Sequence, residues 1–300
     1  MALNEMAWVL MTEAAKKVMR QRLLVLPMIL CVAVAACQSS PNLADVSRER
    51  ELNPNHSTAL ENNNRPLIKI AMLHLELRYA DLEHNALLLE QGIKQAAAQG
   101  AEWIMTPELA LTGYRFDLQI GTEWITVGPD QYVQRIQQLA DELKVVIFLS
   151  HLERAGNQSN SNGNAQSNHA VDTASSSIYN TLFVIDAQGD IIARHHKINT
   201  IPVSEDWSTP GAVPALITVD DYSVGLLICA DAWPSQHAEY LQAHGAEILV
   251  SSASWAPGLY GPEDTWEKRS LETQLPLFVN NRTGIERLFD LCQSSSVVVN

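Results

Sequence analysis

Three short segments of the 300-residue chain place reactive side chains directly after apolar, strand-like runs. Glu108 follows the run 103–105. Lys197 follows the run 191–195, and Cys229 ends a third run. Because ligand sites of open α/β sheets gather at the carboxyl ends of strands, the three side chains are candidates for one site. There a thiol could attack a carbonyl, a carboxylate could carry its proton, and an ammonium could stabilise the resulting negative oxygen.

Each of these residues, taken alone, also has an ordinary structural interpretation. Glu108 is consistent with a helix-capping or salt-bridging acid, and Lys197 with a solvated surface lysine. Cys229 is consistent with an inert buried cysteine. It is equally consistent with a nucleophile whose pKa is lowered by the N-terminus of the helix that follows.

The composition argues against several classes of function. A net charge of −14 repels nucleic acid, so we expect no nucleic-acid partner. The sequence contains no G-x-G-x-x-G, Walker A, H-E-x-x-H or G-x-S-x-G motif. Its nine histidines do not cluster as metal ligands would. Adjacent His195 and His196 point to opposite faces of a strand and are interpreted as a surface pair.

The N-terminal segment has the features of a bacterial lipoprotein signal. Basic residues precede an apolar run over 23–36, which is too short to span a bilayer but suits the core of a signal peptide. The run ends in Val-Ala-Ala before Cys37, like a lipobox, although an ordinary signal peptide or a buried strand would share the apolar run. We expect residues 1–36 to be removed and Cys37 to be lipidated. Gln38 favours the periplasmic face of the outer membrane.

The rest of the chain divides into a tether and one domain. Residues 37–65 are polar and aperiodic, which predicts a flexible tether. Residues 66–300 form the domain, with a low-complexity, disordered insertion at about 155–177. Strands are predicted at 67–73, 103–105, 145–149, 178–186, 191–195, 224–229, 248–250 and 277–279, and helices at 81–99, 130–143, 234–244 and 266–274. This alternation, with a hairpin near 187–190, predicts an α/β fold whose sheets carry helices on their outer faces.

The order of the three motifs, and the residues around them, resemble the nitrilase superfamily of carbon–nitrogen hydrolases over about residues 67–295. The resemblance rests on Glu108 between Pro107 and Gly113-Tyr114, Lys197 after the hairpin, Cys229 at a strand end, Glu205 shortly after the lysine, Asn180-Thr181, and Asn281-Arg282-Thr283-Gly284. It implies a four-layer α-β-β-α sandwich and a homodimer or higher homo-oligomer. The chain stops at Asn300, earlier than most family domains, so we expect its stability or assembly to suffer.

The resemblance also implies a mechanism of amide hydrolysis. Cys229 would form a thioester, Glu108 would act as general base and acid, and Lys197 with the backbone N–H of Ala230 would hold the oxyanion. Glu205 would hold Lys197 or position the substrate. No metal or organic cofactor is needed, and a small-molecule amide is the expected partner. The loop 254–258 is expected to line the pocket.

Amide or carbamoyl substrates are favoured over nitriles, because nitrilases tend to carry Trp-Glu after the cysteine and this chain has Ala230-Asp231. Two alternatives remain open. One is a family member that transfers the acyl group to an amine. The other is a catalytically inactive, membrane-tethered binding protein.

Overall fold

The computed structural model of the protein describes residues 67–156, 177–286 and 289–300. The expected signal segment with Cys37, the tether 37–65 and most of the 155–177 insertion lie outside these residues. At the ends of the insertion, Ala155 donates its backbone N–H to the carbonyl of Ser177 at 2.9 Å. Within the described residues, no helix has the length and apolar character that crossing a membrane requires.

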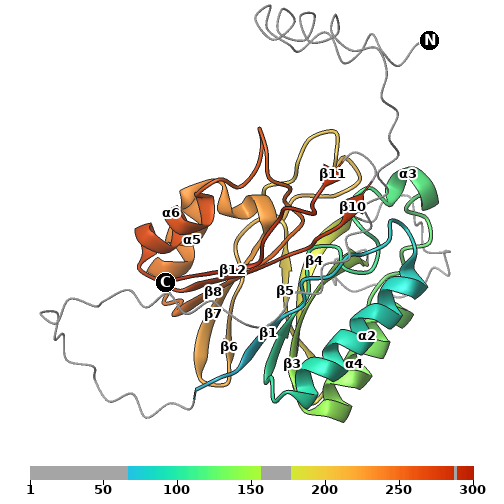
Figure 1. Cartoon of the computed structure of the whole chain (residues 1–300), viewed down its shortest axis with the longest axis horizontal. Coiled ribbons are helices and arrows are strands. Elements are labelled where there is room, and N and C mark those ends of the chain that lie inside the picture. Colours follow the sequence, from blue (N-terminus) through green and yellow to red (C-terminus); the bar gives the residue numbers. More distant parts are fainter. Residues whose placement is uncertain (1–66, 157–176, 287–288) are drawn as a thin grey trace, which may run out of the picture. The chain divides into compact units, whose positions relative to one another are not determined.

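The first sheet has five strands in the order β1–β2–β3–β4–β5 (Figure 1). Their bounds are β1 (Ile70–Met72), β2 (Trp103–Met105), β3 (Val146–Arg154), β4 (Ile178–Ile185) and β5 (Ile191–His196). The first three are parallel, and helices α2 (Leu82–Ala98) and α4 (Gln131–Leu143) connect them in turn. The remaining two are antiparallel, which confirms the predicted hairpin.

The second sheet has the order β12–β9–β8–β7–β6. Its strands are β6 (Leu216–Val219), β7 (Tyr222–Ile228), β8 (Ile248–Ala253), β9 (Leu277–Asn281) and β12 (Val297–Val299), and its helices are α5 (Ser235–Ala243) and α6 (Thr265–Thr273). The three central strands are parallel, and antiparallel strands form both edges. The edge strand β6 was not among the strands predicted from the sequence.

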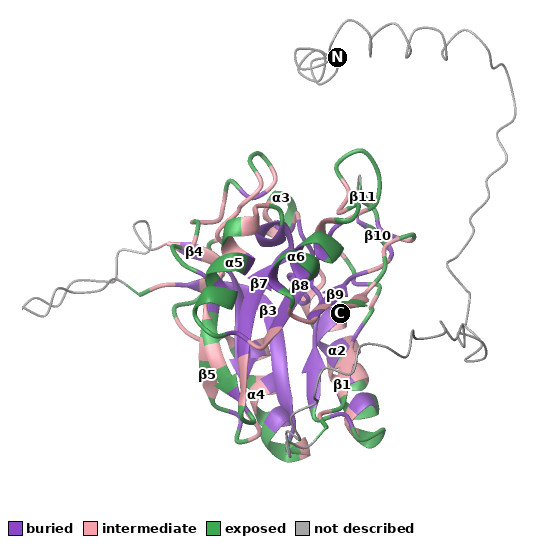
Figure 2. Cartoon of the chain, turned by 90° about the vertical axis from the view of Figure 1, so that its left-hand side faces the viewer, coloured by how far each residue is buried: buried purple, intermediate pink, exposed green. Residues whose placement is uncertain are grey.

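The two sheets pack face to face around one apolar core. Trp103, Phe148 and Leu182 of the first sheet belong to the same buried cluster as Leu226 and Val250 of the second. The central strands are buried along most of their length (Figure 2). Strands covered on both faces read as continuous apolar runs rather than alternating ones, which is why the sequence marked them so clearly. With α2 and α4 outside one sheet and α5 and α6 outside the other, the expected four-layer sandwich is confirmed.

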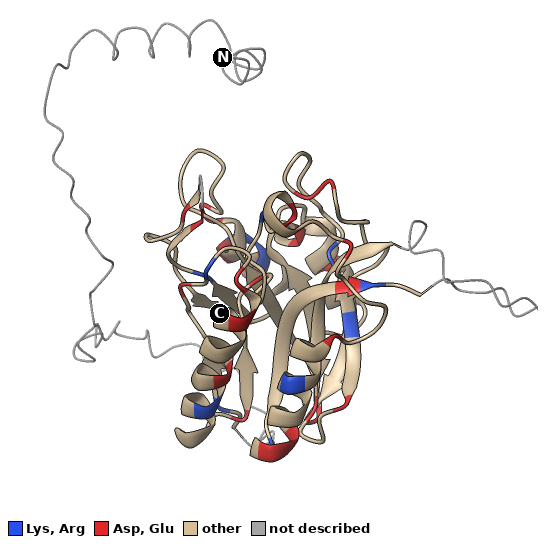
Figure 3. Ribbon diagram, turned by 90° about the vertical axis from the view of Figure 1, so that its right-hand side faces the viewer, with Lys and Arg blue, Asp and Glu red and all other residues tan. Residues whose placement is uncertain are grey.

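The helices of the first layer begin at capping aspartates. Asp81 accepts a hydrogen bond from the His84 backbone at the start of α2, and Asp130 caps α4 in the same way. Both helices carry charged residues (Figure 3). Arg135 of α4 bonds Glu83 and Glu90 of α2, with N–O distances of 2.9 and 2.6 Å. These contacts hold the outer layer in register.

Short elements follow the carboxyl ends of three of the strands. They are α3 (Asp117–Ile120), η3 (Cys229–Ala232), β10 (Ile285–Glu286) and β11 (Phe289–Asp290). Glu286 forms a buried ion pair with Arg282. Its Oε1 also accepts the backbone N–H groups of Tyr114 and Arg115, at 2.5 and 2.8 Å. The antiparallel pair β10–β11, here called the C-terminal hairpin, therefore fixes the loop that follows Glu108.

Candidate active site

Glu108 lies in a turn that both sheets hold. Its backbone N–H donates to the carbonyl of Ala253 in β8 at 3.2 Å. The next residue, Leu109, adopts a φ of 50° and donates its N–H to Ser150 Oγ in β3 at 3.0 Å. A positive φ at a branched residue is unusual and persists only where its surroundings impose it. The turn is thus fixed before the side chain makes any contact.

The carboxylate of Glu108 is completely buried and fully hydrogen-bonded. Its Oε1 accepts from Lys197 Nζ at 2.7 Å and from Asn180 Nδ2 at 2.8 Å. Its Oε2 accepts from the backbone N–H of Ser254 at 3.0 Å. A buried carboxylate is costly unless such partners are present.

A second buried carboxylate, Glu205, shares the same ammonium. Lys197 Nζ donates to Glu205 Oε2 at 2.8 Å, and Asn180 Nδ2 donates to Glu205 Oε1 at 2.9 Å. Glu205 also accepts the backbone N–H of Ile201 at 2.8 Å. Two of the three N–H donors of Lys197 are used in these bonds, which leaves one for a substrate oxygen. The three expected residues Glu108, Lys197 and Glu205 therefore form one cluster.

One ammonium between two carboxylates leaves the cluster with surplus negative charge. Burial raises the pKa of Glu108, an effect that the Lys197 ammonium only partly offsets and that Glu205 reinforces. Burial, the largest single effect, lowers the pKa of Lys197. The negative charge of Glu108, together with smaller effects of Tyr114, Glu205 and Cys229, outweighs burial and raises that pKa well above its usual range. Lys197 accordingly stays charged, while Glu108 binds a proton more readily than a free glutamate does. Those are the properties of an oxyanion donor and a proton carrier.

Cys229 directly follows the last residue of β7. It is buried, opens the short 3₁₀ helix η3, and adopts a φ of 48°. Burial raises the pKa of the Cys229 thiol well above its usual range, and the charge of Glu108 adds to this, whereas Lys197 lowers it. The expectation that a helix N-terminus would favour the thiolate is therefore wrong. Helix α5 begins only at Ser235, and burial with a neighbouring carboxylate dominates.

Asp231 connects the Cys229 turn to the lysine segment. Its buried carboxylate accepts backbone N–H groups from Ile228 at 3.0 Å, Ile198 at 2.9 Å and Asn199 at 2.7 Å. Its Oδ2 also lies 2.8 Å from Nε2 of His195, which is itself buried. The interpretation of His195 as part of a surface pair is therefore wrong. Both imidazoles are paired, since His196 Nε2 lies 2.9 Å from Glu153 Oε2.

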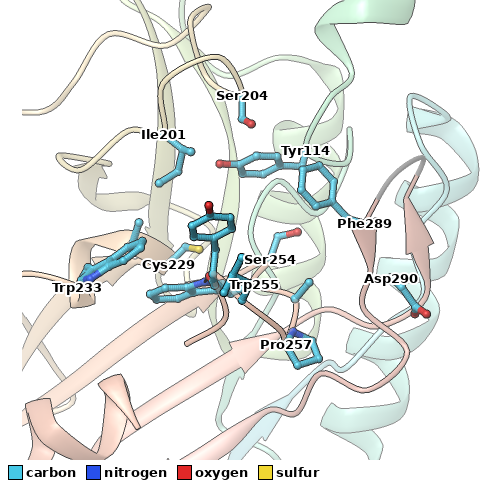
Figure 4. Close-up of a pocket in the computed structure, with 14 residues that line it drawn as sticks. Tyr114, Ile201, Ser204, Cys229, Trp233, Ser254, Trp255, Pro257, Phe289 and Asp290 are labelled. Carbon is cyan, nitrogen blue, oxygen red and sulfur yellow. Dashed lines mark hydrogen bonds between the residues drawn. The ribbon is translucent and has the colours of Figure 1, made fainter. Parts of the chain in front are cut away.

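A cavity of ≈ 380 Å³ opens beside Cys229. Its wall contains Tyr114, Ile201, Ser204, Cys229, Ala230, Trp233, Ser254, Trp255, Ala256, Pro257, Leu259, Tyr260, Phe289 and Asp290. The Cys229 sulfur lies among the labelled side chains of the wall (Figure 4). As expected, the loop 254–258 contributes to this wall. The carboxylates of Glu108 and Glu205 are not part of it, so they lie behind the wall.

Comparison with known proteins assigns the chain to a protein family. The sequence matches the carbon–nitrogen hydrolase family over residues 69–299. This chain belongs to the carbon–nitrogen hydrolase family. Its membership supports hydrolysis of a carbon–nitrogen bond as the general activity of this hydrolase, and it confirms the superfamily that the motifs suggested.

The curated relatives of this carbon–nitrogen hydrolase are similar at low identity. A citrullinase from Francisella tularensis is 28% identical and covers 75% of this chain and 77% of its own. An N-carbamoylputrescine amidase from Arabidopsis thaliana is 27% identical, over 69% of this chain and 68% of its own. Among solved structures, an amidase of Nesterenkonia sp. AN1 superposes with a TM-score of 0.62 at 22% identity, covering 78% of this chain and 82% of that one. In that amidase variant, an acetamide moiety is bonded to the active-site cysteine.

Some site residues of this hydrolase could not have been assigned from sequence alone. Asn180 belongs to one of the motifs that resemble the family, but its hydrogen bonds to both carboxylates are visible only in the structure. Asp231 directly follows Ala230, yet three of the four partners of its carboxylate lie more than thirty residues away in sequence. Tyr114 belongs to the Glu108 motif, but the sequence does not indicate that its ring centroid lies 5.3 Å from Lys197 Nζ. The signal for each of these is local, whereas its contacts are not.

Proposed function

We propose that this carbon–nitrogen hydrolase cleaves small non-peptide amides, including carbamoyl compounds, through a thioester on Cys229. The observation that carries the proposal is the buried cluster in which Glu108 and Glu205 share Lys197 next to a cavity-lining thiol. Such a cluster is costly to bury, and perturbed titratable groups beside a cavity are characteristic of catalytic sites.

In the first half of the reaction, sulfur attacks the amide carbonyl while Glu108 accepts the thiol proton. Because the pKa of Cys229 is raised, the thiol stays protonated until substrate arrives, and proton transfer accompanies attack. The carbonyl oxygen becomes negative and is stabilised by the remaining N–H of Lys197 and the backbone N–H of Ala230. The carbon–nitrogen bond then breaks, and Glu108 returns its proton to the departing nitrogen.

In the second half, water hydrolyses the thioester. Glu108 takes a proton from a water molecule while the oxygen of that water attacks the thioester carbonyl. The carbon–sulfur bond breaks, the sulfur recovers the proton, and the acid is released. Glu205 acts as a positioning residue in this scheme, since it accepts a second N–H of the Lys197 ammonium that Glu108 also binds.

The proposal is tested by measuring ammonia release from small amides, ureides, N-carbamoyl amino acids and nitriles. The Cys229→Ala variant should be inactive, and the matched variant Cys292→Ala should be active, because Cys292 is the other described cysteine and does not line the cavity. Turnover that needs an added amine would instead identify an acyltransferase. Binding without turnover or thioester would identify an inactive binding protein.

We also propose that the mature protein is anchored by lipid on Cys37 at the periplasmic face of the outer membrane. The basis is the apolar run followed by Val-Ala-Ala-Cys. Stable anchoring needs more than one acyl chain. Labelled palmitate should be incorporated into the unchanged protein but not into Cys37→Ser. A fully soluble, unlabelled wild-type protein would rule the anchor out.

A further inference from the structure

The cavity next to Cys229 has a largely aromatic and apolar wall. Five of its side chains are aromatic: Tyr114, Trp233, Trp255, Tyr260 and Phe289. Two pairs of these rings are in contact. The centroids of Trp233 and Trp255 are 5.6 Å apart, and those of Tyr114 and Phe289 are 6.1 Å apart. Figure 4 shows the tryptophan pair on one side of the Cys229 sulfur and the other pair across from it.

The outer part of this wall leaves large apolar groups in water. Leu259 is 86% exposed, Tyr260 77% and Trp233 52%. Such groups gain most when an apolar ligand covers them. The backbone carbonyl of Tyr260 accepts the indole N–H of Trp255 at 2.7 Å, so the loop that carries these rings is fastened to the inner wall. The apolar surface therefore runs from the thiol to the cavity mouth.

The charges around the cavity point the same way. None of the described residues in its wall is lysine or arginine, and Asp290 is the single charged side chain among them. Behind the wall, Lys197 is already shared by Glu108 and Glu205. A carboxylate on the substrate would therefore enter the cavity without a cationic partner and would be repelled by the negative charges of Glu108 and Glu205.

Asp290 does not by itself form a site for a cation. Its residue is exposed, and its Oδ1 already accepts the backbone N–H of Cys292 at 3.0 Å. Figure 4 shows it on the far side of the cavity from Trp233, beyond Phe289. Its charge is therefore largely solvated, and the enclosed part of the wall is neutral.

We infer that the site selects uncharged amides whose acyl group carries an aromatic ring, and that it disfavours amides whose acyl chain ends in a carboxylate or an ammonium. The inference rests on the proposed function and adds the substrate class. The amide would lie at Cys229, and the ring would lie between the two aromatic pairs.

The first experiment compares kcat/KM for four primary amides: acetamide, 3-phenylpropionamide, succinamate and 4-aminobutanamide. We expect 3-phenylpropionamide to exceed acetamide by about tenfold or more, since a buried phenyl group is worth at least one tenfold step. Succinamate and 4-aminobutanamide should fall below 3-phenylpropionamide. Equal or higher values for either charged amide would overturn the inference, although hydrolysis of acetamide would still support the proposed function.

Matched leucine variants test the wall directly. Leu259→Ala removes an exposed apolar group from the cavity mouth, whereas Leu271→Ala removes one that is 73% exposed on α6 and outside the cavity wall. The ratio of kcat/KM for 3-phenylpropionamide to that for acetamide should fall severalfold in Leu259→Ala, mainly through KM, and stay unchanged in Leu271→Ala. The same ratio in both variants would contradict the placement of the ring.

A binding measurement separates this inference from the chemistry. In Cys229→Ala, 3-phenylpropionamide should change tryptophan fluorescence through Trp233 and Trp255 at concentrations at least tenfold lower than succinamate does. Selective binding without turnover in the wild-type protein would refute the proposed function and keep the inference. Turnover with no binding preference would do the reverse.

Discussion

Asp231 Oδ2 lies 2.8 Å from His195 Nε2, and both side chains are buried. The same carboxylate accepts three backbone N–H groups, so it joins the turn that presents Cys229 to the segment that follows Lys197. Neither residue lines the cavity. Their contact therefore fixes the Cys229 turn relative to the Lys197 segment, which in the proposed mechanism positions the nucleophile and the ammonium.

Replacing Asp231 should weaken the fold as well as the reaction. Asp231→Ala strands buried backbone donors, each costing about 1–3 kcal/mol, so we expect a clear fall in the free energy of unfolding. Asp206→Ala is the matched control, because Asp206 is an exposed aspartate that accepts one backbone N–H. Urea denaturation measures both. Equal stability of the two variants would show that Asp231 is not a brace.

The same carboxylate makes stability depend on acid. Although burial opposes it, hydrogen bonding and charge from His195 lower the pKa of Asp231 below its ordinary value. A carboxyl group whose pKa is lower when folded contributes stability above its unfolded pKa of about 3.9 and loses it as pH falls through the folded pKa. Melting temperatures between pH 6 and pH 3 should fall less steeply in Asp231→Asn than in the wild-type protein. Parallel curves would speak against this role.

Glu108→Gln should separate thiol reactivity from turnover. The charge of Glu108 helps raise the pKa of Cys229, so its removal should increase the thiolate fraction near neutral pH. Alkylation of Cys229 by iodoacetamide should therefore become faster, while amide turnover falls by about 10²–10⁴ because the proton carrier is lost. Peptide mapping distinguishes Cys229 from Cys292. Slower alkylation together with slower turnover would mean that Glu108 activates the thiol in every reaction.

Removing Lys197 should expose the repulsion between the two carboxylates. Lys197→Met leaves Glu108 and Glu205 buried without their cation, which typically costs about 3–5 kcal/mol of stability. It should also lower kcat by about 10²–10³ through loss of an oxyanion donor. Adding Glu205→Gln should recover part of the stability but none of the activity. Denaturation and ammonia-release assays on the single and double variants complete a double-mutant cycle. Recovery of activity in the double variant would show that the ammonium takes no part in the reaction.

Much of this architecture could be predicted from the sequence. Strands such as β2 and β7 are buried along most or all of their length, so their apolar runs stand out, and Glu108 and Cys229 follow their carboxyl ends. The short elements β6, β10 and β11 were missed, because two to four residues carry no period of their own. The pKa of Cys229 was predicted in the wrong direction. Its burial depends on residues from the other sheet and on a backbone conformation that no local pattern encodes.

The cavity wall shows the same limit. Its residues come from the loops after β2, β5, β7 and β8 and from the C-terminal hairpin. Besides the expected site residues Cys229 and Ala230, only the loop 254–258 was expected from the sequence to line the pocket. Tertiary packing alone brings Phe289 against Tyr114 and Trp233 against Trp255.

The central claim is that Cys229 carries the acyl group during turnover. The most direct measurement is intact-protein mass spectrometry after rapid mixing with a hydrolysed amide and acid quenching, followed by peptide mapping. The account predicts a mass increase equal to the acyl group on the peptide containing Cys229, formed and lost at rates compatible with kcat and absent from Cys229→Ala. An adduct confined to Cys292, or undiminished turnover in Cys229→Ala, would contradict it.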